Sequence, residues 1–529
     1  MITFFISLGT YLLYLVLKYR KSFYMLQQNS YNVSNRYVKW VFRNSSKVFL
    51  SRDILFIGIY FLYFVIPFNF YAVVMFIFYL YLFYMELRDI KKEQSKKPFV
   101  VTSRIKRLVF TLVVVFLAIT GYIFVNFSFK VVNYYYLVYA LFGYFCFVIT
   151  YIVNIINKPV EKCVYYYYKN KAVHKLNSMN NLIKIGITGS YGKTTSKNIL
   201  NDILNMKYNS FATPKSFNTP YGLMNAINNN LDKFDDVFIA EMGACKKGDI
   251  SLLCKFIKPK YGIITKIGMA HLETFKTIEN TTCEKFKLLE MLPSDGVCVL
   301  NKDDVYQRNY KIKNDCKVIW IGIDNDASVT ASNIKIDSKG MSFDVNFYGK
   351  NTYNFKTSLL GRANIYNILA GASLALYLGV SIDDIIHAVN KLKPTEHRLE
   401  LKKYSDNLTI IDDAFNSNPE GSKMALEVLS LMDGYKVVVT PGMIELGNMQ
   451  EELNEKFGEY ISEVSDMVIL VGKEQTKPIL EGLRKKNYNE KNIYIINDVK
   501  EAFKIINKVG KKNMYVLLEN DLPDIFNEK

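Results

Sequence analysis

A glycine-rich turn between an apolar run and a predicted helix constrains the fold of this chain more than any other feature. Residues 182–187 are mostly apolar and short enough for a buried strand, the letters GITGSYGKTT start at Gly186, and a helical pattern begins at Lys193. Backbone N–H groups in such a turn, with the positive end of the following helix, form a cradle for phosphate. The sequence therefore predicts an α/β domain that binds a nucleotide.

The turn matches a shorter form of the phosphate-loop pattern. The general form GxxxxGK[ST] fails because Ile187 stands where its first glycine would be, whereas TGxxGKTT fits from Thr188. In this form the lysine reaches the outer phosphates and the next hydroxyl faces Mg²⁺. An ordinary Gly/Ser turn is the alternative. We predict nucleotide contacts from Gly189, Ser190, Tyr191, Gly192, Lys193, Thr194 and Thr195.

Composition divides the chain near residue 157. A membrane-spanning helix needs about 20 apolar residues, and the first part of the chain has several long, aromatic-rich runs, which argues against a single signal peptide. One run of 32 residues contains a turn signal around Pro67. We predict a transmembrane domain over residues 1–157. Its apolar runs are residues 2–17, 54–85, 108–125 and 131–156.

Charge predicts how this domain is oriented. Residues 18–52 contain eight Lys/Arg and no Asp/Glu, and residues 86–107 contain eight Lys/Arg against three acids. Such loops stay in the cytoplasm, so an even number of crossings separates them. Dividing the second run at Pro67 gives about five helices in all. The N-terminus then lies outside, and everything after Asn157 lies in the cytoplasm.

The basic charge of the chain does not indicate nucleic-acid binding. The net charge is +18, but residues 1–157 account for +13 of it, which leaves +5 for the other 372 residues. The excess is mainly a membrane-topology signal, and we predict no nucleic-acid partner. The seven cysteines form no CxxC pair, which fits reduced cytoplasmic thiols.

Strand-like and helix-like segments alternate from residue 182 to the end. This rhythm predicts mostly parallel sheets with helices on both faces, and ligands then bind at the carboxyl ends of the strands. We expect a linker at 158–181, a central ATP-binding domain at 182–397 and a dinucleotide-binding-like α/β domain at 398–529. The strands expected in the last are residues 408–411, 436–439, 467–471, 492–496 and 514–518.

Several polar residues follow predicted strands. Glu241 ends one strand and suits a magnesium ligand, although a solvent-facing or N-cap glutamate explains it about as well. His271 follows another, where a structural hydrogen bond is the commoner role. The segment IIDDAFNSNPEG places Asp413, Asn416 and Asn418 after a third. These residues suit a turn and helix entry, and equally the orientation of ribose hydroxyls or small polar substrates.

Taken in order, these motifs resemble the Mur ligases, ATP-dependent amide-bond formers of peptidoglycan synthesis, and most closely the branch that adds a D-alanyl-D-alanine dipeptide. The resemblance covers residue 182 to the C-terminus. It implies a phosphate-loop central domain and a Rossmann-like C-terminal domain. It also implies ATP and two Mg²⁺ ions, with Thr194 and Glu241 as ligands of the first ion.

The resemblance also assigns the second metal site. His271 in GMAHLETF is implied as a ligand, together with Lys285 in the segment IENTTCEK. In family members a lysine at this place is carbamylated by CO₂ and becomes a carboxylate-like ligand. Nothing in the local pattern selects Lys285 over Lys287, so this carbamate rests on the resemblance alone. Lys193, His271 and Lys285 are the implied catalytic residues.

Further contacts are implied by shorter motifs. Phe415 departs from the family, which has tyrosine there. The implied nucleotide contacts are Asn301, Asn364, Arg398 and Asp413. The implied substrate contacts are Asn218 and Thr219 in SFNTPYG. From the segment IIDDAFNSNPEG itself we add Asn416 and Asn418 as candidate substrate contacts.

The N-terminal part departs most from the family. Soluble members begin with a domain that holds the UDP of the acceptor, whereas only 24 residues separate Asn157 from Leu182 here. We therefore expect a membrane-anchored ligase that couples a small-molecule or lipid-linked carboxylate to an amine. A poly-γ-glutamate or capsule-type ligase is the alternative within the class. An ATP-binding membrane scaffold without ligase activity is the alternative outside it.

Overall fold

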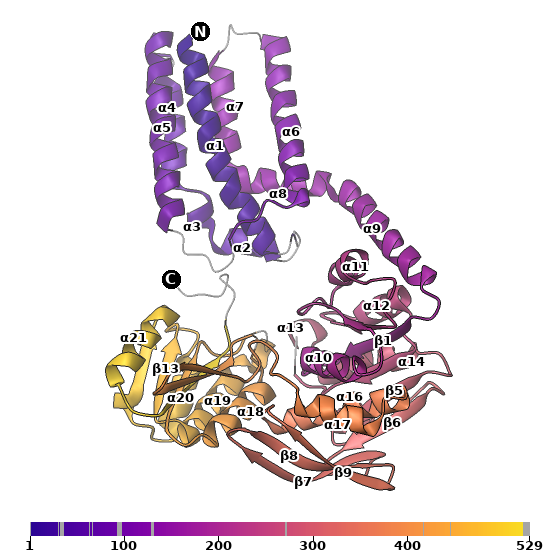
Figure 1. The fold of residues 1–529 in the computed structure, drawn as a ribbon. Coiled ribbons are helices and arrows are strands. Elements are labelled where there is room, and N and C mark those ends of the chain that lie inside the picture. The colour runs from indigo at the N-terminus through magenta and orange to yellow at the C-terminus, as the bar shows by residue number, and fades with distance from the viewer. Residues whose placement is uncertain are drawn as a thin grey trace. The chain divides into compact units, whose positions relative to one another are not determined.

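The computed structural model forms two compact units (Figure 1). A helical unit extends to Tyr167, and an α/β unit begins at Tyr168. The structure describes residues 2–29, 31, 36–62, 64–65, 67–92, 98–127, 132–269, 272–415, 417–444 and 446–521.

Up to residue 156, the described part of the helical unit forms six longer helices and two short ones around an aromatic core. Helix α1 packs along α5, and the core between the helices is rich in tyrosine, including Tyr11, Tyr71 and Tyr139. The helices are α1 (Ile2–Gln28), α2 (Val38–Arg43), α3 (Ser45–Val48), α4 (Ser51–Leu62), α5 (Phe68–Lys92), α6 (Ser103–Phe127), α7 (Val132–Tyr144) and α8 (Cys146–Ile156).

The break expected at Pro67 is confirmed. Helix α4 ends at Leu62 and α5 begins at Phe68, and the Pro67 carbonyl accepts hydrogen bonds from the Phe70 and Tyr71 N–H groups. Proline suits the start of a helix because its missing N–H would have no partner there. The 32-residue apolar run therefore forms two helices.

The run 131–156, expected as one crossing, is bent. Helices α7 and α8 meet at an angle of 81°, because Phe145 between them leaves the helical region at φ −91° and ψ 20°. By length and composition, two described helical segments could cross a membrane, residues 70–91 and 103–126, and the bent pair would be a third. The five crossings stay a prediction.

A buried charge cluster joins three helices of this unit. Lys18 of α1 contacts Asp53 of α4, and its Nζ lies 3.6 Å from Glu86 Oε1 of α5. Arg52 reaches Glu86 Oε1 at 2.7 Å and Asp89 Oδ2 at 2.9 Å. The Lys18, Asp53 and Glu86 side chains are at most 3% exposed. Buried charges are costly unless they are paired, so the cluster fixes how α1, α4 and α5 pack.

The segment expected as a linker is helical. Helix α9 (Lys158–Ser178) fills most of residues 158–181 and leads directly into β1 (Ile183–Thr188). Tyr166, Tyr167 and Tyr168 of α9 are exposed.

The α/β unit contains a nine-stranded sheet in the order β2-β3-β1-β4-β5-β6-β7-β8-β9. Pairing is parallel from β2 to β7, and β7, β8 and β9 then form an antiparallel meander. The remaining strands are β2 (Ser210–Ala212), β3 (Val237–Glu241), β4 (Tyr261–Ile264), β5 (Val297–Asn301), β6 (Lys317–Gly322), β7 (Val329–Asp337), β8 (Gly340–Phe347) and β9 (Asn351–Thr357).

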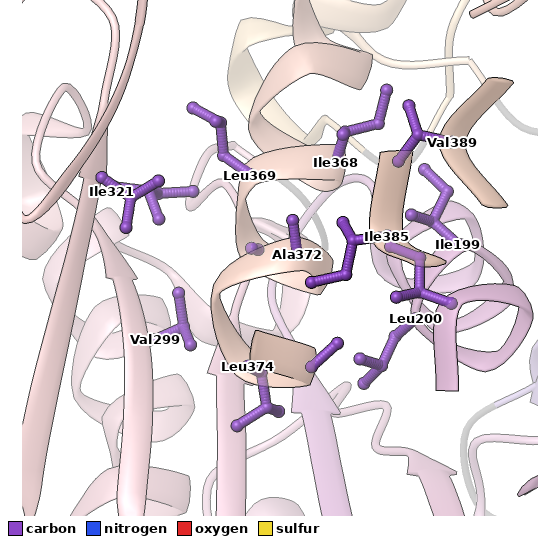
Figure 2. Close-up of a cluster of buried hydrophobic side chains, with 14 of the residues drawn as sticks. Ile199, Leu200, Val299, Ile321, Ile368, Leu369, Ala372, Leu374, Ile385 and Val389 are labelled. Atoms are coloured by element: carbon purple, nitrogen blue, oxygen red, sulfur yellow. The ribbon is translucent and has the colours of Figure 1, made fainter. Parts of the chain in front are cut away.

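Helices pack on this sheet through apolar stripes. Figure 2 shows Ile199 and Leu200 of α10 facing Ile368 and Ala372 of α16, with residues of α17 beside them. This core supports α10, whose first turn borders the phosphate loop. The helices are α10 (Lys193–Leu204), α11 (Pro220–Asn229), α12 (Asp249–Ile257), α13 (Leu272–Phe275), α14 (Ile278–Glu290), α15 (Val305–Arg308), α16 (Arg362–Tyr377) and α17 (Ile382–Asn390).

A second sheet follows in the order β10-β11-β15-β12-β13-β14. All its pairs are parallel except β10 with β11. The strands are β10 (Glu400–Ser405), β11 (Leu408–Asp413), β12 (Tyr435–Thr440), β13 (Met467–Val471), β14 (Ile493–Ile496) and β15 (Met514–Glu519). The helices are α18 (Pro419–Ser430), α19 (Gln450–Val464), α20 (Lys477–Lys485) and α21 (Val499–Val509).

The α/β alternation expected from the sequence is confirmed in both sheets. The five strands expected after residue 398 are present as β11 to β15. Strand β10 was not expected, and neither was the meander β7–β9, whose alternating residues bury one face only.

Candidate active site

The phosphate loop connects β1 to α10 and depends on two glycines. Gly189 and Gly192 have φ values of 152° and 79°. A Cβ on Gly192 would lie 2.8 Å from Asn367 Oδ1, and a Cβ on Gly189 would overlap Thr265 Oγ1. Glycine adopts positive φ without a steric penalty, so both positions need it.

Lys193 folds back over the loop. Its Nζ donates to the carbonyl oxygens of Gly189 at 2.8 Å and Ser190 at 2.9 Å. Burial lowers the pKa of Lys193 because the charged form loses hydration. The lysine is therefore held at the loop by contacts that phosphate oxygens would replace.

Glu241, the last residue of β3, is the polar centre of the site. Its Oε2 accepts hydrogen bonds from Thr194 Oγ1 at 3.0 Å and Lys197 Nζ at 3.2 Å. Its Oε1 accepts one from Asn218 Nδ2 at 3.0 Å. Because Glu241 is only 1% exposed, these partners fix its carboxylate beside the first turn of α10.

Lys285 lies in the middle of α14 and is 3% exposed. Burial, and then the nearby charge of Lys193, lower its pKa to about 7, against the opposite effect of Cys245, Glu284 and Asp249. Near neutral pH much of this amine is uncharged and nucleophilic. An amine in this state reacts with CO₂, whereas an ordinary surface lysine is protonated.

Residues of the second sheet contribute another group of charges. Asp413 ends β11 and lies opposite Glu519, the last residue of β15. The guanidinium of Arg398 lies 4.5 Å from the Phe415 ring centre, which is a cation–π arrangement. Burial raises the pKa of Asp413 to about 6, although Arg398 opposes this shift.

The other predicted contacts have local roles as well. Asn301 accepts from the Asp303 N–H at 2.9 Å, and Asn364 accepts from Asn367 Nδ2 at 3.1 Å. Thr219 caps the N-terminus of α11 and Asn418 caps that of α18. The turn and helix-entry interpretation is therefore confirmed for Asn418.

A cavity of about 690 Å³ brings these residues together. His271 and Asn416 lie outside the described residues. The predicted residues that line the cavity are Gly189, Ser190, Tyr191, Gly192, Lys193, Thr194, Thr195, Asn218, Thr219, Glu241, Lys285, Asn301, Asn364, Arg398, Asp413 and Asn418.

The donor set fits one magnesium ion. Mg²⁺ prefers oxygen ligands and keeps several waters, so one or two protein ligands suffice beside phosphate. The Thr194 hydroxyl and Glu241 carboxylate adjoin at the phosphate loop. In the described ranges, no group of three or more His, Cys, Asp and Glu side chains could form a metal cage. The ion would therefore depend on phosphate oxygens.

Sequence reasoning missed three residues of this cavity region. Lys197 bonds to Glu241 and to the Lys215 carbonyl, and its place one helical turn after Lys193 was a usable signal. Glu519 and Ser417 approach each other only because β15 pairs with β11. No local pattern indicates that contact.

Family comparisons agree with this arrangement. Residues 187–375 match the description "Mur ligase middle domain", and residues 397–519 match "Mur ligase, glutamate ligase domain". The first match includes the phosphate loop and Glu241, and the second begins just before Arg398 and ends at Glu519.

Similar proteins come from several bacteria. The UDP-N-acetylmuramoyl-tripeptide–D-alanyl-D-alanine ligase of Bacillus subtilis (strain 168) is 31% identical over 55% of this chain and 62% of its own length. The Escherichia coli (strain K12) ligase of that name is 29% identical over 55% and 64%. The chain thus spans less than two thirds of either relative.

A solved structure extends the comparison to the fold. The MurF ligase of Thermotoga maritima in complex with ADP superposes with a TM-score of 0.61 and 26% identity, over 68% of this chain and 80% of that one. Sequence, fold and the phosphate-loop cavity agree, so through its two α/β domains this chain belongs to the Mur ligase family.

Proposed function

We propose that this protein is a membrane-anchored, ATP-dependent, ADP-forming amide ligase of peptidoglycan synthesis. It activates an acceptor carboxylate as an acyl phosphate and couples it to an amine such as D-alanyl-D-alanine. The observation that carries the proposal is the cavity that joins the phosphate loop, Glu241 and Lys285 to Arg398 and Asp413 of the second sheet.

The first half-reaction is phosphoryl transfer. An acceptor carboxylate oxygen attacks the γ-phosphorus of ATP, the bond to the β-phosphate oxygen breaks, and ADP leaves. Lys193 and the N-terminus of α10 stabilise the charge that spreads over the phosphate oxygens. Magnesium bound through Thr194 and Glu241 would neutralise β- and γ-phosphate charge.

Lys197 and Asn218 support this step through Glu241. Each donates a hydrogen bond to the carboxylate, which restricts its rotation and keeps one oxygen beside the Thr194 hydroxyl. Preorganised groups need little rearrangement when charge develops. The two residues are therefore positioning residues.

We further propose that Lys285 acts as a carbamate and, with His271, holds a second Mg²⁺. Its uncharged amine nitrogen bonds to the carbon of CO₂ and loses a proton, which gives an anionic oxygen ligand. The lowered pKa and burial of Lys285 support this.

The second half-reaction is acyl transfer. The uncharged amine nitrogen attacks the acyl carbon, the carbon–oxygen bond to phosphate breaks, and the proton that the nitrogen loses leaves with the phosphate. Arg398 and Asp413 come from the domain that supplies the far wall of the cavity. Exclusion of water by these walls protects the acyl phosphate from hydrolysis.

Membrane anchoring rests on the helical unit. Helix α6 leaves large apolar side chains uncovered, among them Phe110, Leu117 and Val125, which are 60% exposed or more. Exposed apolar surface of this extent marks a site of membrane or protein contact. With the basic loops on the cytoplasmic side, we propose that the α/β unit is cytoplasmic and that lipid covers α6.

One assay tests the ligase assignment. The purified full chain is given ATP, Mg²⁺, UDP-N-acetylmuramoyl-tripeptide and D-alanyl-D-alanine, with each component omitted in turn. ADP release that requires both the acceptor and the amine supports a ligase. ATP binding without turnover over a broad panel of acids and amines would support a scaffold instead.

A further inference from the structure

The strand order divides the cavity into two sides. In the nine-stranded sheet, β1 and its phosphate loop lie between β3 and β4. Asn301, an implied nucleotide contact, ends β5 on one side of the phosphate loop. Ser216 and Asn218 follow β2, Cys245 follows β3, and these residues line the cavity on the other side. Because the carboxyl ends of parallel strands lie at one edge of the sheet, a nucleotide that reaches Asn301 leaves the β2 and β3 side for the acceptor.

Three segments join into one rim on that side. The Asn218 carbonyl accepts a hydrogen bond from the Gly243 N–H at 2.8 Å, which connects the loop after β2 to the loop after β3. The Cys245 carbonyl accepts one from Thr274 Oγ1 of α13, and Phe275 of α13 also lines the cavity. We call these segments the β2–β3 rim. It consists of the described residues 213–219, 242–249 and 274–279.

The β2–β3 rim is positively charged. It holds four lysines and two acids, Asp249 and Glu279. The Asp249 carboxylate already accepts hydrogen bonds from the Cys245 and Lys246 backbone N–H groups, at 2.9 and 3.0 Å. All four lysines are exposed, and among the described residues none of them forms an ion pair. Excess positive charge at the edge of a cavity attracts anions. The lysines are Lys215, Lys246, Lys247 and Lys276.

Hydrogen bonds connect this rim to the phosphate and metal site. Lys197 donates to the Lys215 carbonyl and to Glu241 Oε2. Asn218 donates to Glu241 Oε1 at 3.0 Å. The Glu241 carboxylate therefore fixes the loop that carries Lys215, and an acceptor bound at the rim lies next to the place where its carboxylate would be activated.

We propose that the four lysines of the β2–β3 rim bind the diphosphate group of the acceptor, whether that group joins the acceptor to a nucleotide or to a lipid. This inference rests on the proposed ligase function. Lysine binds phosphate as a compact point charge on a flexible stem, which suits exposed positions at the cavity edge. In UDP-N-acetylmuramoyl-tripeptide the diphosphate and the reacting carboxylate are at opposite ends of the molecule. The carboxylate then enters the cavity while the diphosphate stays at its edge.

The test compares wild type with the double variant Lys246→Ala/Lys247→Ala. Both lysines are exposed, and neither takes part in the mechanism above. The control is Lys504→Ala/Lys508→Ala, which removes two exposed lysines of α21. Amide formation gives kcat and the KM for each acceptor. Calorimetry gives the dissociation constant of UDP-N-acetylmuramoyl-tripeptide and so measures binding without turnover.

Three acceptors separate the diphosphate from its carrier. The first is UDP-N-acetylmuramoyl-tripeptide. The second is the same muramoyl-tripeptide joined through a diphosphate to a lipid and supplied in detergent. The third is N-acetylmuramoyl-tripeptide without a diphosphate. Of the first two, the acceptor with the lower KM in wild type identifies the carrier that the enzyme prefers.

For Lys246→Ala/Lys247→Ala we expect the KM of both diphosphate acceptors, and the dissociation constant of the UDP-linked one, to rise about five- to thirtyfold, because two exposed charge contacts are lost. The kcat should stay within about twofold of wild type, since the chemical step is untouched. The KM of the acceptor without a diphosphate should not change. Added salt should weaken acceptor binding more in wild type than in the variant, because exposed charges are screened. The α21 control should match wild type throughout.

Two results would overturn the inference alone. If wild type forms the amide and Lys246→Ala/Lys247→Ala has an unchanged KM for both diphosphate acceptors, the rim does not bind the diphosphate. An equal rise in KM for the acceptor without a diphosphate would exclude the diphosphate as the group recognised. Failure of the ligase assignment would look different. Wild type would then bind the UDP-linked acceptor more tightly than the variant and form no amide, whereas the absence of both binding and amide would refute both proposals.

Discussion

At the scale of single residues, the site is defined by buried ionisable side chains. Lys285 shows this most clearly, because its neighbours on α14 are ordinary helix residues while its own amine is buried. The sequence alone could not separate it from Lys287. Burial does, because Lys287 remains partly exposed and pairs with Glu290.

Replacement of Lys285 should raise stability and remove activity. In CO₂-free buffer, Lys285→Met deletes a buried amine whose pKa falls from 10.5 to about 7 on folding. The unfolding free energy should rise at pH 7 by several kcal/mol, up to about 5, since each pKa unit corresponds to about 1.4 kcal/mol. Denaturant titration and an ATPase assay measure the two effects.

The stability that Lys285→Met adds should depend on pH, and the sign of this dependence follows from the lowered pKa of Lys285. Between pH 7 and 10.5 the unfolded chain holds a proton on Lys285 that the folded chain has lost, so wild-type stability rises with pH across this window. The advantage of Lys285→Met should therefore shrink from pH 7 to 10.5. The control Lys287→Met should show no such trend, and a constant advantage would contradict the account.

The carbamate has a separate chemical test. Lys285→Ala should lose ATP-dependent coupling, and short carboxylates such as acetate or formate should restore part of it by supplying the missing oxygen ligand. Activity assays with and without each acid measure this. Full activity of Lys285→Ala without any added acid would refute the carbamate.

At the scale of elements, the strand–turn–helix around the phosphate loop was the part most readable from sequence. Its signals are local, because a buried strand, glycines and a helix start follow one another directly. The positions of Lys197 and Glu519 depend instead on contacts to Lys215 and Ser417. The pairing of β15 with β11 creates the contact of Glu519 with Ser417, and the packing of α10 beside the segment after β2 creates that of Lys197 with Lys215, so no short window of sequence contains both partners.

Gly192→Ala should damage nucleotide binding beyond its effect on stability. Both Gly192 and Gly248 have left-handed φ values, 79° and 93°, so alanine at either costs about 1–2 kcal/mol of stability. Only at Gly192 does the added Cβ meet a neighbour, Asn367 Oδ1, because Gly248 faces open space. Binding of a fluorescent ATP analogue should fall for Gly192→Ala and persist for Gly248→Ala.

The buried charge cluster of the helical unit predicts that a buried lysine and an exposed lysine differ in their effect on stability. Lys18→Met leaves the Asp53 carboxylate buried without its nearest cation, while Arg52 still pairs with Glu86, and breaking a buried ion pair in this way costs about 3–5 kcal/mol. Lys39, an exposed residue of α2, is the control. Thermal stability in detergent should fall for Lys18→Met and stay unchanged for Lys39→Met.

At the scale of the whole molecule, composition predicted a division into a helical part and an α/β part, and the structure forms two such units. Apolar runs and basic loops extend over many residues. They therefore predict the division of the chain correctly even where the ends of single helices are uncertain from the sequence. The bend between α7 and α8 was not readable, because it depends on the backbone angles of Phe145 alone.

Membrane insertion is testable on the full chain. We expect the protein to stay with the membrane pellet after alkaline carbonate extraction, since lipid would cover the apolar face of α6. A cysteine introduced at Met1 should react with an impermeant thiol reagent from outside intact cells, because the proposed topology places the first basic loop in the cytoplasm. Labelling of that cysteine only after lysis would contradict the N-out topology.

The most direct test of the central claim is ADP release by the purified full chain and by its Lys193→Ala variant, each with ATP, Mg²⁺, acceptor and amine. Wild type should release ADP and form the amide in equal amounts, and only when both the carboxylate and the amine are present. Lys193→Ala should do neither, because the loop loses the cation that stabilises the phosphates. ADP release that does not require the acceptor and the amine would contradict the account. ADP release by Lys193→Ala at the wild-type rate would contradict it as well.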